Sequence, residues 1–378
     1  MSGTKRWAAG LFIALIFMYN HVGALAQGET SAKAACVLEL ETGRVLFEQN
    51  ARARLPMAST TKVMTALLAI ENGDLSAPVT CSANAFGVPG TSIYLAEGET
   101  LTLEQMLYGL MLASGNDAAV AIAEHIGGSV PQFVQRMNAR AAELGAANTH
   151  FANPNGLPDD THVTTAYDLA RIARAAMGND TFRKIVSTQR AEIPWAGRSY
   201  NRHLKNKNRL LESYPGATGV KTGYTKAAGR CLVSSAKRDG MELIAVILKG
   251  KTSPDRFADA QTLLNYGFAS YALKTVIPDE PLPPVPVTLG TQATVQPVLG
   301  EENQLLLEKA KTGELSQSVT LESSVQAPVA VGDRLGTLTV TFGEEVLVEL
   351  PLLAGEEVPR ITFRQMLPRV LRIACLVE

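Results

Sequence analysis

A serine followed by a lysine three positions later occurs three times in this chain and could supply a nucleophile with its own base. The pairs are Ser2 with Lys5, Ser59 with Lys62, and Ser234 with Lys237. A serine hydroxyl attacks a carbonyl effectively only when a neighbouring group takes its proton. A lysine amine can take that proton when burial or a second positive charge destabilises its protonated form. Such a pair predicts acyl transfer through a serine ester.

Only the pair Ser59 and Lys62 stands at the start of a predicted helix. The pattern predicts a helix from Ser59 to Glu71 that ends at Asn72-Gly73, and its residues 63–70 leave no polar face. A helix that is apolar on all sides is buried in a large domain. Positions i and i+3 share a helix face, so the amine of Lys62 would lie near the hydroxyl of Ser59.

The other two pairs lack this setting. Ser2 falls in an N-terminal segment that we expect to be removed. Ser234 and Lys237 run off the end of a predicted strand, where positions i and i+3 face opposite sides. Ser59 and Lys62 are therefore the candidate catalytic pair.

A second cation is available in a Lys-Thr-Gly triplet. Lys221-Thr222-Gly223 lies on a predicted strand, where Gly223 would let a substrate backbone approach the strand edge closely. The triplet recurs at Lys311, but that copy follows a proline-rich linker and lies in a polar stretch of another domain. We therefore assign the second cation to Lys221.

A Ser-x-Asn pattern also occurs three times. The pairs are Ser82 with Asn84, Ser114 with Asn116, and Ser199 with Asn201. Ser114 and Asn116 occupy a break between two apolar helices predicted over 103–113 and 117–126, where side chains can project into a cleft. The other two pairs lie in polar segments without flanking buried helices, so Ser114 and Asn116 are the candidates.

The elements that must hold these residues indicate an α+β domain with an antiparallel sheet flanked by helices. Strands are predicted over 34–40, 44–48, 220–222, 230–236 and 241–248. Further helices are predicted over 165–177 and 256–271. Glycine-containing turns between the last three strands are typical of an antiparallel meander.

Composition divides the chain into four regions. Five prolines between Pro278 and Pro286 predict a stiff linker, and short β-rich runs alternate with turns beyond it. The regions are a signal peptide at 1–26, a catalytic domain at 27–275, a small all-β sandwich domain at 276–358 and an amphipathic tail at 359–378.

The N-terminus is typical of an exported protein. Lys5-Arg6 precedes an apolar run over residues 7–18, and Ala24-Leu25-Ala26 is a small-residue cleavage signal. The alternative is an uncleaved membrane helix, but the run is shorter than the roughly 20 residues of a span. The chain is expected at the outer face of the cytoplasmic membrane or in the cell wall space.

The C-terminal tail predicts a basic amphipathic helix. Its apolar positions follow helical spacing, and three arginines lie off that stripe. The apolar positions are Phe363, Met366, Leu367, Val370, Leu371 and Ala374. We expect this helix to lie on a membrane surface. The alternative is a helix packed on the β domain, and Pro368 weakens the helix prediction itself.

Composition excludes several classes of protein. The formal net charge is −1 in 378 residues, so no basic field for nucleic acid is present. The four cysteines form no Cys-x-x-Cys pair, and no His-Glu-x-x-His pattern occurs, so we expect no metal and no cofactor. One disulfide is possible, but the sequence does not pair Cys36, Cys81, Cys231 and Cys375, and we favour their interpretation as small buried hydrophobic residues.

The three motifs in the order Ser59, Ser114, Lys221 resemble those of the low-molecular-mass penicillin-binding proteins, the serine-type D-alanyl-D-alanine carboxypeptidases. The middle motif reads Ser-Gly-Asn where the common pattern has Ser-Asp-Asn. Longer stretches are similar too, including Asn153-Pro154-Asn155-Gly156 and Leu264-Asn265-Tyr266-Gly267. The resemblance covers roughly residues 30–275 and implies a β-lactamase/transpeptidase-like domain.

The resemblance implies roles for the catalytic residues. Ser59 would be the nucleophile, Lys62 its general base, and Ser114 the group that passes a proton to the leaving D-alanine. Asn116 would orient Lys62 and the substrate amide. The backbone N–H groups of Ser59 and Tyr224 would form the oxyanion hole.

The resemblance also implies how the substrate's terminal carboxylate is bound. Lys221 and Thr222 would meet it, with Gly223 beside them. The family places a further cation about fourteen residues before the Lys-Thr-Gly lysine; Lys207 fits that position, and Arg209 is an alternative.

The implied function is removal of the terminal D-alanine from peptidoglycan stem peptides, with β-lactams as acylating inhibitors. A D,D-endopeptidase could use the same site. A class A β-lactamase would need a Glu-x-x-x-Asn pattern, which this chain lacks. A third hypothesis, an inactive wall-binding module, is disfavoured because every catalytic residue is present.

Overall fold

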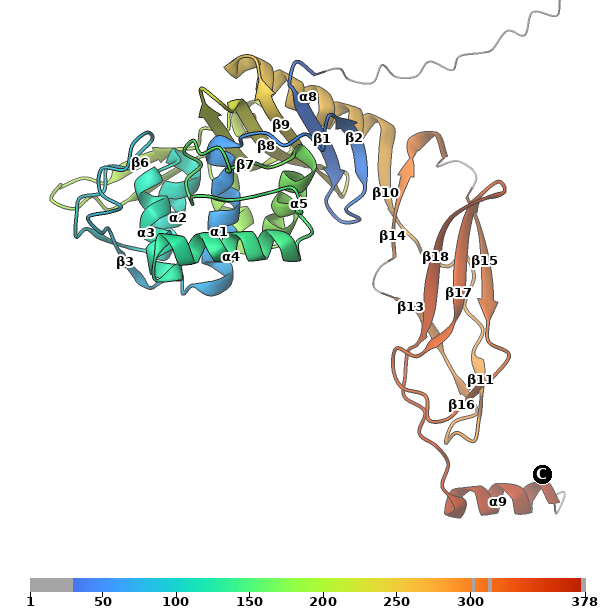
Figure 1. The fold of residues 1–378 in the computed structure, drawn as a ribbon. Helices are drawn as coiled ribbons and strands as arrows, with labels where there is room; N and C mark the ends of the chain where they lie inside the picture. Colours follow the sequence, from blue (N-terminus) through green and yellow to red (C-terminus); the bar gives the residue numbers. More distant parts are fainter. Residues whose placement is uncertain (1–29, 301–302, 312–314, 375–378) are drawn as a thin grey trace, which may run out of the picture.

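The computed structural model describes residues 30–300, 303–311 and 315–374, and Figure 1 shows its two parts, a broad N-terminal domain and a slender β-rich domain that ends in a helix. The expected signal peptide at 1–26 lies outside the described residues.

A five-stranded antiparallel sheet forms the centre of the N-terminal domain, in the order β2-β1-β9-β8-β7. Its strands are β1 (Ala34–Glu39), β2 (Val45–Gln49), β7 (Ala217–Thr225), β8 (Gly229–Arg238) and β9 (Met241–Gly250). The predicted meander is confirmed by the pairing of β7 with β8 and of β8 with β9. Strand β1 pairs with β9, so the two ends of the domain meet inside the sheet.

Alternating residues of the central strands feed two hydrophobic cores, because successive side chains of a strand point to opposite faces. In β9, Ile244 and Val246 belong to the larger core, whereas Leu243 and Ala245 belong to the smaller one. Apolar residues on both faces explain why β9 reads as a continuous hydrophobic run. The sheet is therefore covered on both sides.

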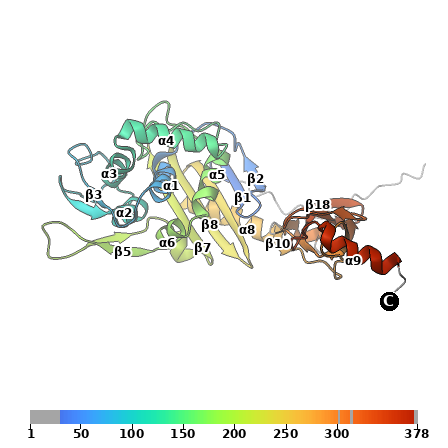
Figure 2. The ribbon, with the colours of Figure 1, turned by 90° about the horizontal axis from the view of Figure 1, so that it is seen from below.

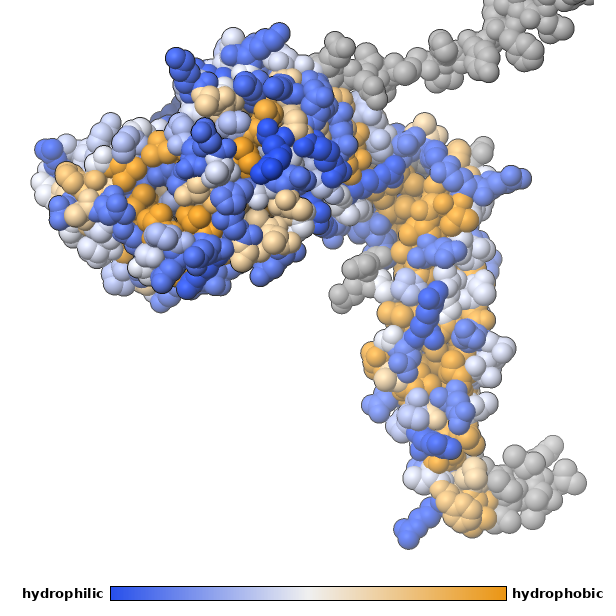
Figure 3. All heavy atoms as spheres, viewed as in Figure 1, coloured by the Kyte–Doolittle hydropathy of each residue, from blue (hydrophilic) through white to orange (hydrophobic). Residues whose placement is uncertain are grey.

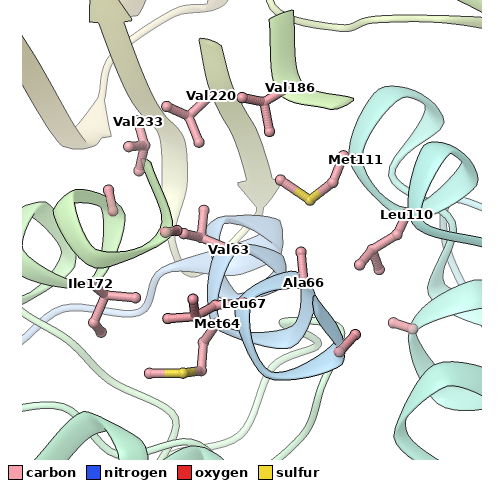
Figure 4. Close-up of a cluster of buried hydrophobic side chains, with 14 of the residues drawn as sticks. Val63, Met64, Ala66, Leu67, Leu110, Met111, Ile172, Val186, Val220 and Val233 are labelled. Atoms are coloured by element: carbon pink, nitrogen blue, oxygen red, sulfur yellow. The ribbon is translucent and has the colours of Figure 1, made fainter. Parts of the chain in front are cut away.

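Helix α8 (Ser253–Ser270) packs on one face of the sheet, and α1 (Lys62–Asn72), α5 (Ala166–Met177) and α6 (Asp180–Ser187) lie on the other (Figure 2). Every residue of α1 from Lys62 to Ala69 is buried. Figure 4 shows its apolar side chains packed among those of other segments, including Leu110, Ile172 and Val233. The prediction of a central helix without a polar face is confirmed.

The remaining elements of this domain lie around α1. They are the 3-10 segment η1 (Ala58–Thr61), α2 (Leu103–Tyr108), the π-helical segment η2 (Gly109–Ala113), α3 (Asn116–Gly127), α4 (Val130–Glu143), α7 (Leu210–Ser213) and the hairpins β3–β4 (Pro78–Thr80, Thr100–Thr102) and β5–β6 (Arg190–Ile193, Arg202–Lys205). The sequence pattern predicted neither α4 nor α6, nor the two hairpins.

The second domain is all-β apart from a short 3-10 turn and its final helix. Its elements are β10 (Tyr271–Thr275), β11 (Val285–Thr288), β12 (Thr294–Val295), β13 (Pro297–Leu299), β14 (Gln304–Glu308), η3 (Lys309–Lys311), β15 (Leu315–Leu321), β16 (Val325–Gln326), β17 (Arg334–Phe342) and β18 (Glu345–Ala354). They form the sheets β10-β14, β12-β11-β16 and β13-β18-β17-β15. One small core combines residues of β11, β12, β17 and β18, and another combines residues of β14, β17 and β18.

The predicted proline linker is not where the chain crosses between the domains. Strand β10 follows α8 directly and already pairs with β14 of the second domain. The prolines come after this pairing and lead into β11 at Val285. The strand pairing that joins the domains therefore precedes the proline-rich segment.

Helix α9 (Phe363–Ala374) ends the described chain and contains Pro368 in its interior. Phe363 is 73% exposed and Leu367 is 47% exposed, so the first turns of the helix do not bury their apolar side chains against the β domain. Figure 3 shows apolar surface at this far end of the molecule. Among the residues described, no helix is both long and apolar enough to cross a bilayer.

Candidate active site

A cleft of about 930 Å3 opens where η1, β7 and the segment between β6 and α7 meet. Ser59, Ser114, Thr222, Gly223 and Tyr224 all line it, together with the two rival cations Lys207 and Arg209. The structure thus brings together residues from three motifs that are far apart in sequence. Lys62, Asn116 and Lys221 are buried immediately behind them.

Ser59 lies in the 3-10 turn η1 rather than in the first turn of α1, which begins at Lys62. The residue before it, Ala58, has a φ of 48°, a left-handed conformation that is strained for a residue with a side chain. In a 3-10 turn positions i and i+3 share a face. The side chains of Ser59 and Lys62 are therefore adjacent, as predicted, although the helix begins later than predicted.

The amine of Lys62 has three oxygen neighbours. Its Nζ lies 3.1 Å from Ser59 Oγ, 2.7 Å from Asn116 Oδ1 and 2.7 Å from the carbonyl oxygen of Asn155. A neutral amine has two N–H donors and one lone pair. Two of the neighbours can only accept, so the lone pair of a neutral Lys62 faces the hydroxyl of Ser59.

Burial, together with the positive charge of Lys207, lowers the pKa of Lys62 to about 7, whereas Asp117 opposes the shift. The sequence predicts Lys221 as the second cation, and Lys207 is a further positive charge that acts on Lys62. Burial lowers the pKa of Lys221 itself well below the usual lysine value, and the positive charges of Lys62 and Lys207 act in the same direction.

Asn116 is held from two sides. Its backbone N–H donates to Thr91 at 2.7 Å, and its side-chain Nδ2 donates to the carbonyl of Pro89 at 2.6 Å. Because Nδ2 is occupied, Oδ1 is the atom that faces Lys62. Ser114 precedes it with a φ of 67°, in the turn that ends η2 and opens onto the cleft.

Strand β7 is an edge strand of the sheet and lies against η1. A Cβ atom at Gly223 would come within 3.1 Å of Met57 O, Ser59 N and Thr60 N. The sequence predicts that this glycine lets a substrate backbone approach the strand. In the structure, the segment that carries the nucleophile also packs closely against this position. Gly223 thereby allows Thr222 and Tyr224 to flank Ser59.

Sequence reasoning missed two contributors to the site. Asn155 acts through its backbone carbonyl, which no residue pattern reveals. Arg256 of α8 lines the cleft while donating to the carbonyls of Gly223 and Cys231 at 3.0 and 3.2 Å, and burial lowers its pKa to about 10. Its buried Nε has no hydrogen-bond partner. A single arginine after a Ser-Pro-Asp helix start gives no signal of this role.

The rejected motif copies have structural roles. Ser82 and Asn84 both donate to Glu124, at 2.6 and 2.8 Å. Ser234 donates to a strand carbonyl, and Lys311 pairs with Glu345 in the second domain. Over the described ranges, no cluster of His, Cys, Asp or Glu could hold a metal ion. Cys36, Cys81 and Cys231 are buried free thiols, whereas Cys375 lies outside the described residues.

Comparison with protein families gives two matches that together cover most of the chain. Residues 21–252 match the family described as D-alanyl-D-alanine carboxypeptidase, and residues 273–360 match the one described as penicillin-binding protein 5, C-terminal domain. These matches confirm the resemblance and the α+β-plus-β fold that the sequence predicted.

Individual relatives agree with the family matches. The chain is 36% identical to D-alanyl-D-alanine carboxypeptidase DacF of Bacillus subtilis over 90% of this chain and 89% of the relative. It is 32% identical to D-alanyl-D-alanine carboxypeptidase DacC of Escherichia coli over 86% of this chain and 84% of the relative.

The structure is similar to that of penicillin-binding protein 5 of Haemophilus influenzae, with a TM-score of 0.75 and 27% sequence identity. The match covers 88% of this chain and 98% of that chain. A mutant of the Streptomyces K15 DD-transpeptidase matches with a TM-score of 0.61 and 36% sequence identity, over 64% of this chain and 99% of that chain. The first covers both domains of this chain, and the second covers about two thirds of it.

Proposed function

Because the chain belongs to the D-alanyl-D-alanine carboxypeptidase family, we propose that it removes the terminal D-alanine from peptidoglycan stem peptides through an ester of Ser59. The observation that carries this proposal is the contact of Lys62 with Ser59, Asn116 and Asn155 at the edge of a cleft. That arrangement supplies an activated serine without a histidine or a metal.

Acylation begins when the lone pair of Lys62 takes the proton of Ser59 Oγ, which attacks the carbonyl carbon between the two D-alanines. The backbone N–H groups of Ser59 and Tyr224 stabilise the negative charge that forms on the carbonyl oxygen. The C–N bond then breaks, and Ser114 passes a proton to the departing amine. Water hydrolyses the ester in a second half-reaction and regenerates Ser59.

The terminal carboxylate of the substrate meets the positive side of the cleft. Thr222 and Lys207 line the cleft, with Lys221 buried behind them, and the guanidinium of Arg256 also lines it. Arg209 lines the same cleft and stays the alternative to Lys207. A β-lactam carries both an amide-like carbonyl and a carboxylate, so it acylates Ser59 in the same pose and inhibits the enzyme.

Replacing Ser59 by alanine tests this function. We expect the Ser59→Ala variant to release no D-alanine from a pentapeptide and to take up no labelled penicillin, with products identified by mass spectrometry. Ser199→Ala is the matched control, because Ser199 belongs to a rejected Ser-x-Asn pair and is exposed. Labelling retained by Ser59→Ala would refute the assignment. Cleavage of cross-linked dimers in place of pentapeptides would identify a D,D-endopeptidase.

The location of the enzyme is a further part of this proposal. The N-terminal segment exports the chain, and the amphipathic tail holds it on the outer face of the cytoplasmic membrane. The sequence of residues 1–26 supports the first step, and the exposed Phe363 and Leu367 support the second.

A further inference from the structure

A buried histidine lies behind the nucleophile and takes no part in the mechanism described above. His162 is 2% exposed and stands shortly before α5. It is not among the residues that line the cleft. It lines a separate cavity of about 130 Å3, together with Ala58 and Gly156.

The hydrogen bonds of His162 fix which ring nitrogen carries the proton. Nδ1 accepts from the backbone N–H of Ala152 at 3.0 Å, so this nitrogen presents a lone pair. Nε2 lies 2.7 Å from Thr61 Oγ1. In a neutral imidazole one nitrogen accepts and the other donates. Nε2–H therefore donates to Thr61.

Thr61 connects His162 to Ala58, the residue that precedes the nucleophile, through two hydrogen bonds of its hydroxyl. Its hydroxyl accepts from His162 and donates in turn to the carbonyl of Ala58 at 2.8 Å. Ala58 is the left-handed residue that sets the direction of the chain into Ser59. The same carbonyl also lies so close to Gly156 that a Cβ atom there would overlap it. The peptide group after Ala58 thus has a hydrogen bond from Thr61 and is packed closely against Gly156.

We propose that His162 is a positioning residue for Ser59, because its Nε2–H orients Thr61 and Thr61 holds the strained Ala58 that aims the serine at Lys62 and the substrate. This inference rests on the proposed role of Ser59 as nucleophile. No member of the chain from His162 to Ala58 lines the cleft, so the contact acts on the acylation step rather than on substrate binding. A misplacement of about 1 Å can lower a rate on the order of 100-fold.

The surroundings of His162 keep its imidazole neutral, as this hydrogen-bond pattern requires. Burial lowers the pKa of His162 to about 4, His150 and Lys62 act in the same direction, and Asp159 opposes them. Phe151 packs its ring edge-on against the imidazole, with the centroids 5.9 Å apart. Near pH 7 the ring therefore has one donor and one acceptor.

Two amide variants separate the two hydrogen bonds of the ring. Glutamine at position 162 can place an N–H where Nε2 lies, whereas the shorter asparagine reaches only the position of Nδ1. We expect His162→Gln to keep the acylation rate constant for a penicillin within about threefold of wild type, and His162→Asn to lose about tenfold or more. The dissociation constant of the noncovalent complex should be unchanged in both.

Chemical rescue gives an independent test, because a cavity already adjoins the ring. In His162→Ala the lost side chain enlarges the cavity of about 130 Å3, so added imidazole can occupy the vacated place. We expect millimolar imidazole to restore acylation. 1-Methylimidazole has the same shape but no N–H, so it should not restore it. Thr61→Val, which keeps the shape but removes the hydroxyl, should be slow and resist rescue.

Equal acylation by His162→Asn and His162→Gln, or equal rescue by imidazole and 1-methylimidazole, would overturn the inference. Thermal unfolding of every variant checks that the fold is intact. Peptide mapping of the penicilloyl group keeps the two proposals apart. A label found away from Ser59 in wild type defeats the proposed function, whereas a label on Ser59 with equal variants defeats only the role of His162.

Discussion

At the scale of single residues, the site depends on keeping Lys62 neutral. The two carbonyl oxygens from Asn116 and Asn155 take its N–H groups and leave the lone pair for Ser59. A protonated Lys62 would instead donate to the serine and could not remove its proton. The pKa of about 7 therefore decides the pH at which the enzyme works.

We expect the acylation rate constant to rise with pH through a midpoint near 7 and to level off above it, because deprotonation of Lys62 creates the base. Lys207→Gln removes a neighbouring positive charge that lowers the pKa of Lys62. Its midpoint should therefore move to higher pH. Stopped-flow acylation by a chromogenic β-lactam measures both profiles. Lys237→Gln, a change of an exposed lysine on β8, serves as the control, and an equal shift in that variant would contradict the argument.

At the scale of elements, the β5–β6 hairpin is fastened to the rest of the domain by one buried ion pair. Both terminal nitrogens of Arg202 donate to the carboxylate of Glu99 at 2.6 Å, and the side chains are 3% and 2% exposed. Arg202 also donates to the carbonyls of Pro194 and Tyr94. The hairpin continues directly into Lys207 at the cleft.

Breaking a buried pair leaves one charge without compensation, so we expect Arg202→Met to lower the free energy of unfolding by about 3–5 kcal/mol. Lys184→Met breaks an exposed pair with Glu104 and should cost less than about 1 kcal/mol. Urea unfolding measures both. Equal losses in the two variants would show that Arg202 does not stabilise the hairpin.

Hydrophobic pattern predicted the elements whose residues are buried on every side. Helix α1 and strand β9 are examples, because their apolar runs leave no ambiguity about burial. Helix α4 was not predicted, because it buries only Phe133, Met137 and Ala141, along one side of the helix. The late start of α1 could not be predicted either, because Ala58 takes a left-handed conformation and its carbonyl packs against Gly156, about a hundred positions away.

The candidate site could also be predicted from the sequence only in part. Residue spacing and the predicted flanking elements distinguished Ser59 and Ser114 from the other copies of their motifs, because a reactive side chain is identified by its residue type. The carbonyl of Asn155 and the effect of Lys207 on Lys62 depend on how distant segments pack. Backbone groups and through-space charges have no residue type of their own, so sequence alone does not reveal them.

At the scale of the whole molecule, the β-rich domain lies between the N-terminal domain, which holds the cleft, and α9 at its far end (Figure 1). The domains are joined by the pairing of β10 with β14 and by Arg44, which donates to the carbonyl of Leu306 at 3.2 Å. The second domain therefore separates the catalytic cleft from the proposed membrane contact.

Deleting residues 360–378 should abolish sedimentation with anionic lipid vesicles, because the exposed apolar side chains and the arginines of α9 are lost together. Release of D-alanine from a soluble pentapeptide should be unchanged, since no cleft residue belongs to that segment. The full chain with vesicles of neutral lipid is the control for charge. Continued sedimentation of the truncated chain would place the membrane contact elsewhere.

The charges around the cleft also bear on how a substrate arrives. Lys205, Lys207, Arg209, Arg230 and Arg256 line it, and Glu212, paired with Lys205, is its one carboxylate among the described residues. A field of one sign in a concave site attracts an oppositely charged ligand before contact and raises the rate of encounter. At an ionic strength of 0.1 M that attraction extends only about 10 Å. In a cell wall, the local salt concentration would thus set how far from the enzyme a free peptide carboxylate is captured.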